Sequence, residues 1–364
     1  MLKYIIIIAV VFNFTACFKS EKGDIQIGFV AGLSGKYSSL GTSIRDGFIL
    51  AFDEIDNTIN GKNIKIIQKD DKQDAKEAKK IIDNFVKNNI KLIVGNATSS
   101  MTAVSFPVIN KQKDSLLFSV TASSSEFSNK DDNFLRLQVE QSEKRYIELA
   151  KYIKKYKYHK VFFIYDGNNK SYAKGYEGFF QNMIIKNGGI KFVASMDLNE
   201  PYGKIVNKIK DIQNDLILIV GNSIDSANII QYLRINEIKS KILISGWSKT
   251  LDFIENGGKS VEGVVVSTGY DEQSKDKKFL SFVKNFKIKY GKEPSVFAAQ
   301  GYELGQILIK SLKQSDDIST LKDRIIKTKT FDGLQGDIVF DKYGDVYRDY
   351  FVMEVKNAEF IKVK

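Results

Sequence analysis

A cluster of hydroxyl side chains follows a buried apolar run in the segment 91–107, KLIVGNATSSMTAVSFP. Leu92–Val94 is a predicted strand, and a helix is expected to begin near Met101. Hydroxyl groups at residues 98–100 would cap the free backbone N–H groups of that helix. The same N–H groups and the helix dipole also attract anions. The chemistry that this segment offers is therefore either simple helix capping or the binding of a carboxylate.

The elements that position this segment alternate between strand and helix along the chain. Thr42 or Ser43 is expected to cap the first helix, and Asp74 the second. Alternation of this kind predicts two doubly wound parallel α/β halves, and 364 residues exceed the usual size of one core. Small polar residues and tyrosines follow the strands in both halves, where open α/β sheets bind ligands. The predicted strands cover residues 24–33, 64–68, 92–94, 116–120, 160–165, 191–196, 216–220, 241–245 and 261–267.

The chain is basic, with a formal net charge of +11 from 55 Lys and Arg against 44 Asp and Glu. Its lysines are interspersed with acids, as in KDDKQDAKEAKK, whereas nucleic-acid sites favour arginine forks and clustered basic patches. The charge therefore indicates a lysine-rich solvated surface, and nucleic acid is not expected as a partner. The few arginines are Arg45, Arg136, Arg145, Arg234, Arg324 and Arg348.

The first residues have the pattern of a bacterial lipoprotein signal. A positive segment, Met1–Lys3, precedes the apolar run Tyr4–Phe14, which is too short for a membrane span. Two small residues then lead to Cys17, the only cysteine, which this pattern would lipidate. An ordinary signal peptide or a buried cysteine is the alternative. We expect a signal peptide over 1–16, a tether over 17–23, and a body anchored by lipid on the periplasmic or extracellular face of a bacterial membrane.

No catalytic or metal-binding constellation stands out in the sequence. His159, the only histidine, lies in the basic segment KKYKYHK. A Ser–His pair, a metal-ligand cluster and a phosphate-binding loop are all missing from the sequence pattern. Neither an enzyme nor a cofactor or metal site is therefore expected. A transcriptional regulator of similar architecture would need an N-terminal helix-turn-helix where the signal segment stands.

Motifs spread over the whole mature chain resemble those of the periplasmic substrate-binding proteins of the branched-chain amino-acid (Leu/Ile/Val-binding) ABC transporter family, which have the type I binding-protein fold. Each motif is short, and their order and spacing together carry the resemblance. They are GFVAGLSGKYSSLG (28–41), GFILAFDEI (47–55), QKDDKQDAKEAKK (68–80), IVGNATSSMTAV (93–104), FSVTASSS (118–125), FLRLQ (134–138), VFFIYDGNNKSYAKG (161–175) and YGKEPSVFAAQGYELGQIL (290–308).

The resemblance implies two Rossmann-like lobes joined by a hinge of three crossings, near 136–139, 265–268 and 347–350. A hinge motion would close the lobes on a ligand, and the closed form would dock on a membrane permease. The implied division is lobe one over 24–136 plus 267–346 and lobe two over 137–266 plus 347–364.

The resemblance also carries over site residues position by position. Ser99 matches the family's carboxylate-binding serine, and Thr121 and Ser123 match the pair that meets the α-amino and carboxylate groups. Tyr172 matches the tyrosine that reaches across from the second lobe, and Tyr37 matches an aromatic wall. The alternative is helix capping for the two serines and a surface loop position for the two tyrosines.

Two positions depart from the family's amino-acid binders. Ser223 stands where a tyrosine is frequent, and Trp247 stands where an acid pairs with the ammonium group. Asp225 is a candidate replacement for that acid, although it would more simply cap its helix. Trp247 would either stack on a flat, apolar or cationic ligand or pack between the lobes. The carboxylate half of the site is therefore predicted, and the amine half stays open.

The sequence thus predicts a monomeric, lipid-anchored binding protein of an ABC importer. Its ligand is expected to be a small carboxylate, with an apolar or branched-chain amino acid favoured. The alternative is a sensing protein that binds an aromatic or organic acid, or an amide, and signals through a partner receptor.

Overall fold

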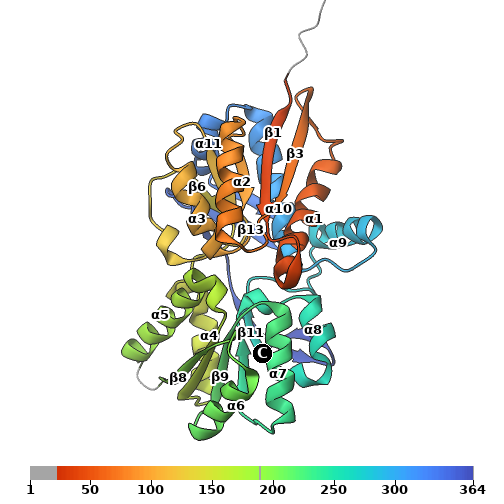
Figure 1. Cartoon of the computed structure of the whole chain (residues 1–364). Helices are drawn as coiled ribbons and strands as arrows, with labels where there is room; N and C mark the ends of the chain where they lie inside the picture. The colour runs from red at the N-terminus through yellow and green to blue at the C-terminus, as the bar shows by residue number, and fades with distance from the viewer. Residues whose placement is uncertain (1–22, 188–189, 364) are drawn as a thin grey trace, which may run out of the picture.

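The computed structural model describes residues 23–187 and 190–363, which form two α/β lobes stacked end to end (Figure 1). The predicted signal peptide over 1–16, Cys17 and all of the predicted tether except Gly23 lie outside the described residues. Within the described part of the chain, no helix is long and apolar enough to cross a membrane.

The first lobe is built on a six-stranded sheet with the order β2-β3-β1-β4-β5-β6. Its pairs are parallel apart from the short antiparallel edge formed by β2 and β3. The central strands β4 and β5 are buried at every residue, as parallel strands are when helices cover both faces of a sheet. The strands are β1 (Ile25–Ala31), β2 (Thr58–Ile59), β3 (Lys62–Asp70), β4 (Leu92–Gly95), β5 (Leu116–Ser119) and β6 (Phe134–Arg136).

Helices on the two faces complete this lobe, and two of them touch through their backbones. A Cβ atom at Gly47 would lie 1.8 Å from the carbonyl oxygen of Ala298, and one at Gly301 would lie 2.2 Å from that of Ile44. Glycine is therefore required on both sides of the α1–α10 contact. The lobe contains α1 (Ser38–Asp53), α2 (Ala75–Lys87), α3 (Ser99–Ile109), α9 (Lys277–Tyr290), α10 (Val296–Gln314), α11 (Leu321–Thr328) and a small sheet of β12 (Thr330–Gly333), β13 (Gly336–Phe340) and β14 (Val346–Tyr347).

The second lobe has a seven-stranded sheet with the order β16-β15-β11-β10-β9-β7-β8, in which β15 pairs antiparallel with both of its neighbours. Its strands are β7 (Lys160–Tyr165), β8 (Lys191–Asp197), β9 (Leu216–Val220), β10 (Lys241–Ile244), β11 (Val265–Thr268), β15 (Phe351–Lys356) and β16 (Glu359–Lys362). Its helices are α4 (Glu143–Lys155), α5 (Lys170–Asn187), α6 (Tyr202–Asp211), α7 (Ser223–Ile235) and α8 (Leu251–Gly257).

Two predicted helix starts are wrong, and one is confirmed. Helix α1 begins at Ser38 because a 3-10 turn leads straight into it, so the Thr42 hydroxyl lies inside the helix and donates to the Ser38 carbonyl at 2.7 Å. Helix α3 begins at Ser99, earlier than predicted, with Thr98 as its N-cap. Asp74 caps α2 as expected, accepting from two backbone N–H groups of the first turn.

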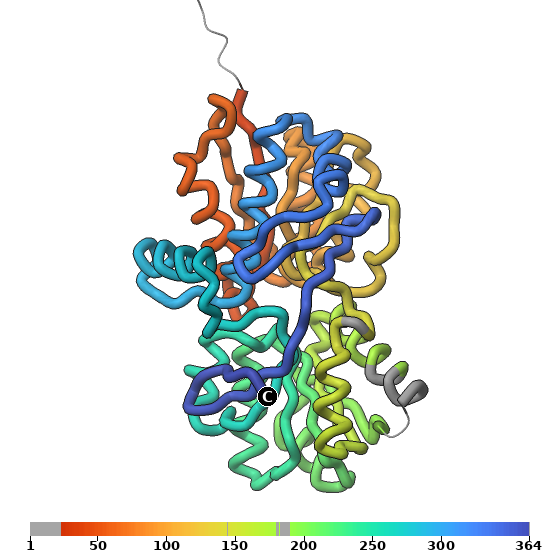
Figure 2. Tube along the Cα trace, turned by 180° about the vertical axis from the view of Figure 1, so that it is seen from behind, coloured from red at the N-terminus to blue at the C-terminus, as the bar shows by residue number. Residues whose placement is uncertain are grey.

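The chain crosses between the lobes after β6, β11 and β14, and Figure 2 shows the last of these crossings running from one lobe to the other. Strand β11 pairs with β15 through Thr268, so the predicted boundary between 266 and 267 falls within a strand of the second sheet. The finer lobe boundaries stay a prediction.

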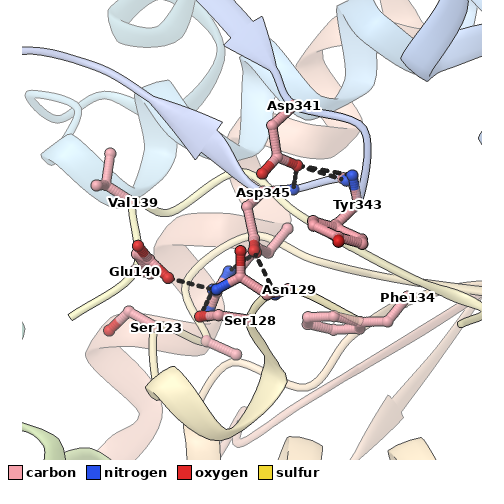
Figure 3. Close-up of polar contacts among 12 residues, drawn as sticks. Ser123, Ser128, Asn129, Phe134, Val139, Glu140, Asp341, Tyr343 and Asp345 are labelled. Atoms are coloured by element: carbon pink, nitrogen blue, oxygen red, sulfur yellow. Dashed lines mark hydrogen bonds and ion pairs between the residues drawn. The ribbon is translucent and has the colours of Figure 1, made fainter. Parts of the chain in front are cut away.

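The first crossing is fastened to the start of the third by a buried arginine. Arg136 ends β6, and its Nε donates to Asp345 Oδ1 at 2.7 Å. Its Nη1 donates to the Ser124 carbonyl at 2.8 Å. Asp345, Glu140 and Ser128 gather around this point (Figure 3). The guanidinium therefore ties together segments far apart in the sequence.

Candidate ligand-binding site

A small cavity of about 30 Å³ lies where the two lobes meet. Five of the seven predicted ligand residues line it: Ser99, Thr121, Ser123, Tyr172 and Trp247. Their roles in binding stay predictions. The other lining residues are Leu40, Ala97, Thr98, Gln138, Arg145, Asn169, Gly246 and Phe297.

The first-lobe side of the cavity is the N-terminus of α3. Gly95 ends β4 with a φ of +142°, and a Cβ there would lie 2.2 Å from the Val30 carbonyl oxygen, so only glycine fits. Ser99 Oγ accepts from the backbone N–H groups of Ser123 and Ser124, each at 3.2 Å. Because Thr98 caps α3, the Ser99 hydroxyl is available to bind the backbone of the turn that contains Ser123 and Ser124.

Ser123 brings an unused hydroxyl to the same side. Its side chain is fully buried, and its Oγ has no hydrogen-bond partner. The Thr121 hydroxyl, in contrast, already donates to the Ala97 carbonyl at 2.5 Å. A buried polar group without a partner is unfavourable unless a ligand supplies one. An anion at the N-terminus of α3 would accept from Ser123 and gain from the helix dipole.

The second-lobe side is aromatic. Tyr172 lies in the first turn of α5 rather than in a loop, and its ring meets Trp247 edge to face at 5.9 Å. Trp247 also stacks with Tyr37, with ring centroids 6.0 Å apart. Trp247 therefore packs between the lobes and also lines the cavity. Its stacking on a ligand stays a prediction. Burial raises the pKa of the Tyr172 phenol well above its ordinary value, so this hydroxyl stays protonated.

Tyr37 does not line the cavity but holds the lobes together. Its hydroxyl donates to Asp166 Oδ2 at 3.0 Å, across the lobe interface. Burial and the charge of Asp166 raise its pKa, which keeps it a donor. Beside it, the backbone N–H of Ser100 donates to Asn169 Oδ1 at 3.2 Å, and the N–H of Ser171 donates to Ser100 Oγ at 3.3 Å. The lobes are thus joined by polar contacts around the rim of the cavity.

Ser223 and Asp225 also lie outside the cavity lining. Ser223 is the first residue of α7 and is buried behind its cap, Asn222. Asp225 Oδ2 forms an ion pair with Lys36 at 2.7 Å and accepts from Asn222 at 2.8 Å. In this structure Asp225 therefore bridges the lobes and does not replace the missing acid.

Sequence reasoning missed Arg145. This residue belongs to the first turn of α4, lines the cavity, and is 3% exposed. Its Nη1 donates to the Val139 carbonyl at 2.9 Å, and its guanidinium carbon lies 5.3 Å and 5.1 Å from the ring centres of Tyr146 and Tyr350. The scarcity of arginine in this lysine-rich chain was the available signal.

The chain matches the family model for periplasmic binding proteins over residues 24–359, and it belongs to that family. The Leu/Ile/Val-binding protein of Escherichia coli (strain K12) is 23% identical over 331 residues, covering 89% of this chain and 88% of that protein. The resemblance stated from the motifs is therefore confirmed. The matched family and the E. coli relative are named as binding proteins, and this chain is not an enzyme.

Solved structures confirm the type I binding-protein fold. A leucine binding protein from Thermotoga maritima superimposes with a TM-score of 0.85 at 22% identity, over 93% of this chain and 98% of that one. A solute binding protein from R. palustris, in complex with benzoate, superimposes with a TM-score of 0.83 at 15% identity, over 94% and 96%.

Proposed function

We propose that this protein is the solute-binding component of an ABC importer, and that it traps a small carboxylate with an apolar body between its lobes. The observation that carries the proposal is the cavity itself, where the N-terminus of α3 and the unpartnered Ser123 hydroxyl face the ring of Trp247. The first two suit a carboxylate, and the ring suits an apolar group. Hinge closure on the ligand would present the form that docks on a membrane permease.

The candidate ligands follow from this division of the cavity. Sequence reasoning favours an apolar or branched-chain amino acid, in keeping with the name of the E. coli relative. The R. palustris structure holds benzoate, a carboxylate without an amino group, in the same fold. Isothermal titration calorimetry of the purified, dialysed protein against a panel of amino acids and organic acids tests the proposal. We expect saturable binding of at least one carboxylate, and binding of none would refute it.

We also propose that the protein is a monomer anchored to the outer face of the membrane by a lipid on Cys17. The sole cysteine directly after a short apolar run supports this. Fractionation of cells that express the Cys17→Ser variant checks the anchor. The variant should appear in the soluble fraction, and its retention in the membrane fraction would rule the anchor out.

A further inference from the structure

The cavity contains a buried cation without a protein counter-charge. Ion pairs among the described residues include Arg136 with Asp345 and Arg348 with Glu303, but none includes Arg145. The Arg145 side chain is nevertheless buried, and its Nε has no hydrogen-bond partner. One carbonyl oxygen, that of Val139, is the acceptor found for its donors. A guanidinium stays charged under all ordinary conditions, so this burial leaves a charge uncompensated.

Aromatic stacking does not replace the missing anion. Tyr146 and Tyr350 lie within cation–π range of Arg145, at 5.3 and 5.1 Å. Such contacts are weaker than a buried ion pair. They also do not engage the N–H donors, which lie in the plane of the guanidinium. The donors that remain belong to a side chain that lines the ligand cavity.

Two buried carboxylates, one in each lobe, already have partners in the protein. Asp166 accepts from Tyr37 and from the backbone N–H of Asn168, and Asp71 accepts from Asn96 and the N–H of Gln73. Neither of these carboxylates lines the cavity, and no acidic side chain appears among its lining residues in the described chain. The net charge of the lining is therefore positive.

The position of the guanidinium bears on the amine half of the site. A Cβ atom at Gly246 would lie 4.0 Å from Arg145 Nη2, so the guanidinium adjoins the turn that carries Trp247. That turn is where the motif resemblance expects an acid for a ligand's ammonium group. In this chain an ammonium group there would meet a cation and no carboxylate, which is unfavourable in a low-dielectric cavity.

We infer that the site selects organic-acid anions that lack an ammonium group, and that Arg145 supplies the counter-charge to their negative charge. The inference rests on the proposed function and narrows it. The ligand's apolar body would lie against Leu40, Trp247 and Phe297, which share the cavity with Arg145. A ligand without an ammonium group needs no acidic side chain in the cavity to pair with it. The lack of an acid in the cavity lining therefore favours such ligands over amino acids.

Matched ligand pairs test this inference. L-leucine and 4-methyl-2-oxopentanoate share a carbon skeleton and differ at the α-position, as do L-phenylalanine and phenylpyruvate. Calorimetry on the full protein should find the oxo acid of at least one pair bound about tenfold or more tighter than its amino acid, since one charge-assisted contact is worth that much. The Arg145→Gln variant should lose about ten- to a hundredfold in oxo-acid affinity and most of this preference.

Two further variants separate charge from structure. Arg145→Lys keeps the charge and should restore part of the preference. Arg234→Gln removes a guanidinium that donates to the carbonyl oxygens of Ile238 and Ser240 outside the cavity, so it should leave both affinities unchanged.

The outcomes are distinguishable from those of the proposed function. If the amino acid binds as tightly as its oxo acid, or tighter, in every pair that binds, the inference is overturned and the carboxylate-binding function stands. An oxo-acid preference that Arg145→Gln leaves intact would also overturn it. Binding of no carboxylate at all would remove the proposed function and the inference with it.

Discussion

Arg136 and Arg145 are both buried beside the first crossing between the lobes, yet their partners differ. Arg136 is fully buried and donates to Asp345 at 2.7 Å, to the Ser124 carbonyl and to the Ser128 hydroxyl. Arg145 is nearly as buried and has one carbonyl acceptor and no carboxylate among the described residues. The first guanidinium is satisfied by the fold, whereas the second is satisfied only if something binds.

Arg348, at the third crossing, makes the contrast sharper. Like Arg145, it lies over an aromatic ring, with its guanidinium carbon 5.2 Å from the centre of Tyr270. Unlike Arg145, it also forms an ion pair with Glu303 at 2.8 Å. Arg348 therefore has both an aromatic ring and an acid as partners, whereas Arg145 has aromatic rings and no acid. The arginine without an acid is the one that lines the cavity.

The largest expected effect is on stability, and it differs between the Arg136 and Arg145 variants. Arg136→Met should lower the free energy of unfolding of the ligand-free protein by about 3–5 kcal/mol, because it leaves Asp345 and the Ser124 carbonyl without their donor. Arg145→Met should stay within about 1 kcal/mol of the parent, because it removes an uncompensated charge together with one hydrogen bond. Urea unfolding of both variants measures the difference. Equal losses would make Arg145 a second structural arginine.

The same contrast explains what the sequence could reveal. The alternation of strands and helices, and the hydroxyl clusters after them, arise from local patterns, so two α/β halves with polar strand ends were predictable. The type I fold and the positions of Ser99 and Ser123 at the ligand site came from motif resemblance. Tyr172 and Trp247 also reached the cavity, on motif resemblance. Each of these residues lies shortly after a strand that the sequence pattern predicts.

What the sequence could not reveal depends on distant partners. Arg136 and Arg145 look alike in the sequence, and only the presence of Asp345 beside one of them tells the two apart. Tyr37 was assigned to the ligand, but its hydroxyl meets Asp166 from the other lobe. Whether a polar group is paired across the fold is a property of tertiary structure, which periodicity and spacing do not encode.

The Ser99 hydroxyl, like Arg136, already has hydrogen-bond partners within the protein. Because its Oγ accepts from two backbone N–H groups, Ser99→Ala should cost both stability and affinity. We expect binding of the tightest carboxylate to weaken by about 1–3 kcal/mol, through the loss of a contact to a charged group. Calorimetry measures the affinity and thermal unfolding without ligand measures the stability. An unchanged affinity would return Ser99 to a purely structural role.

Ser123 and Ser105 give the smallest effect and the closest match. Both hydroxyls are fully buried and neither has a hydrogen-bond partner, but only Ser123 lines the cavity. Ser123→Ala should therefore weaken carboxylate binding by about 1 kcal/mol, roughly fivefold, while stability without ligand stays nearly constant. Ser105→Ala, in the interior of α3, should leave the affinity unchanged. If calorimetry finds equal losses of affinity in the two variants, the effect comes from the packing around α3. The unpaired hydroxyl of Ser123 would then not contact the ligand, in contrast to the role that we infer for the guanidinium of Arg145.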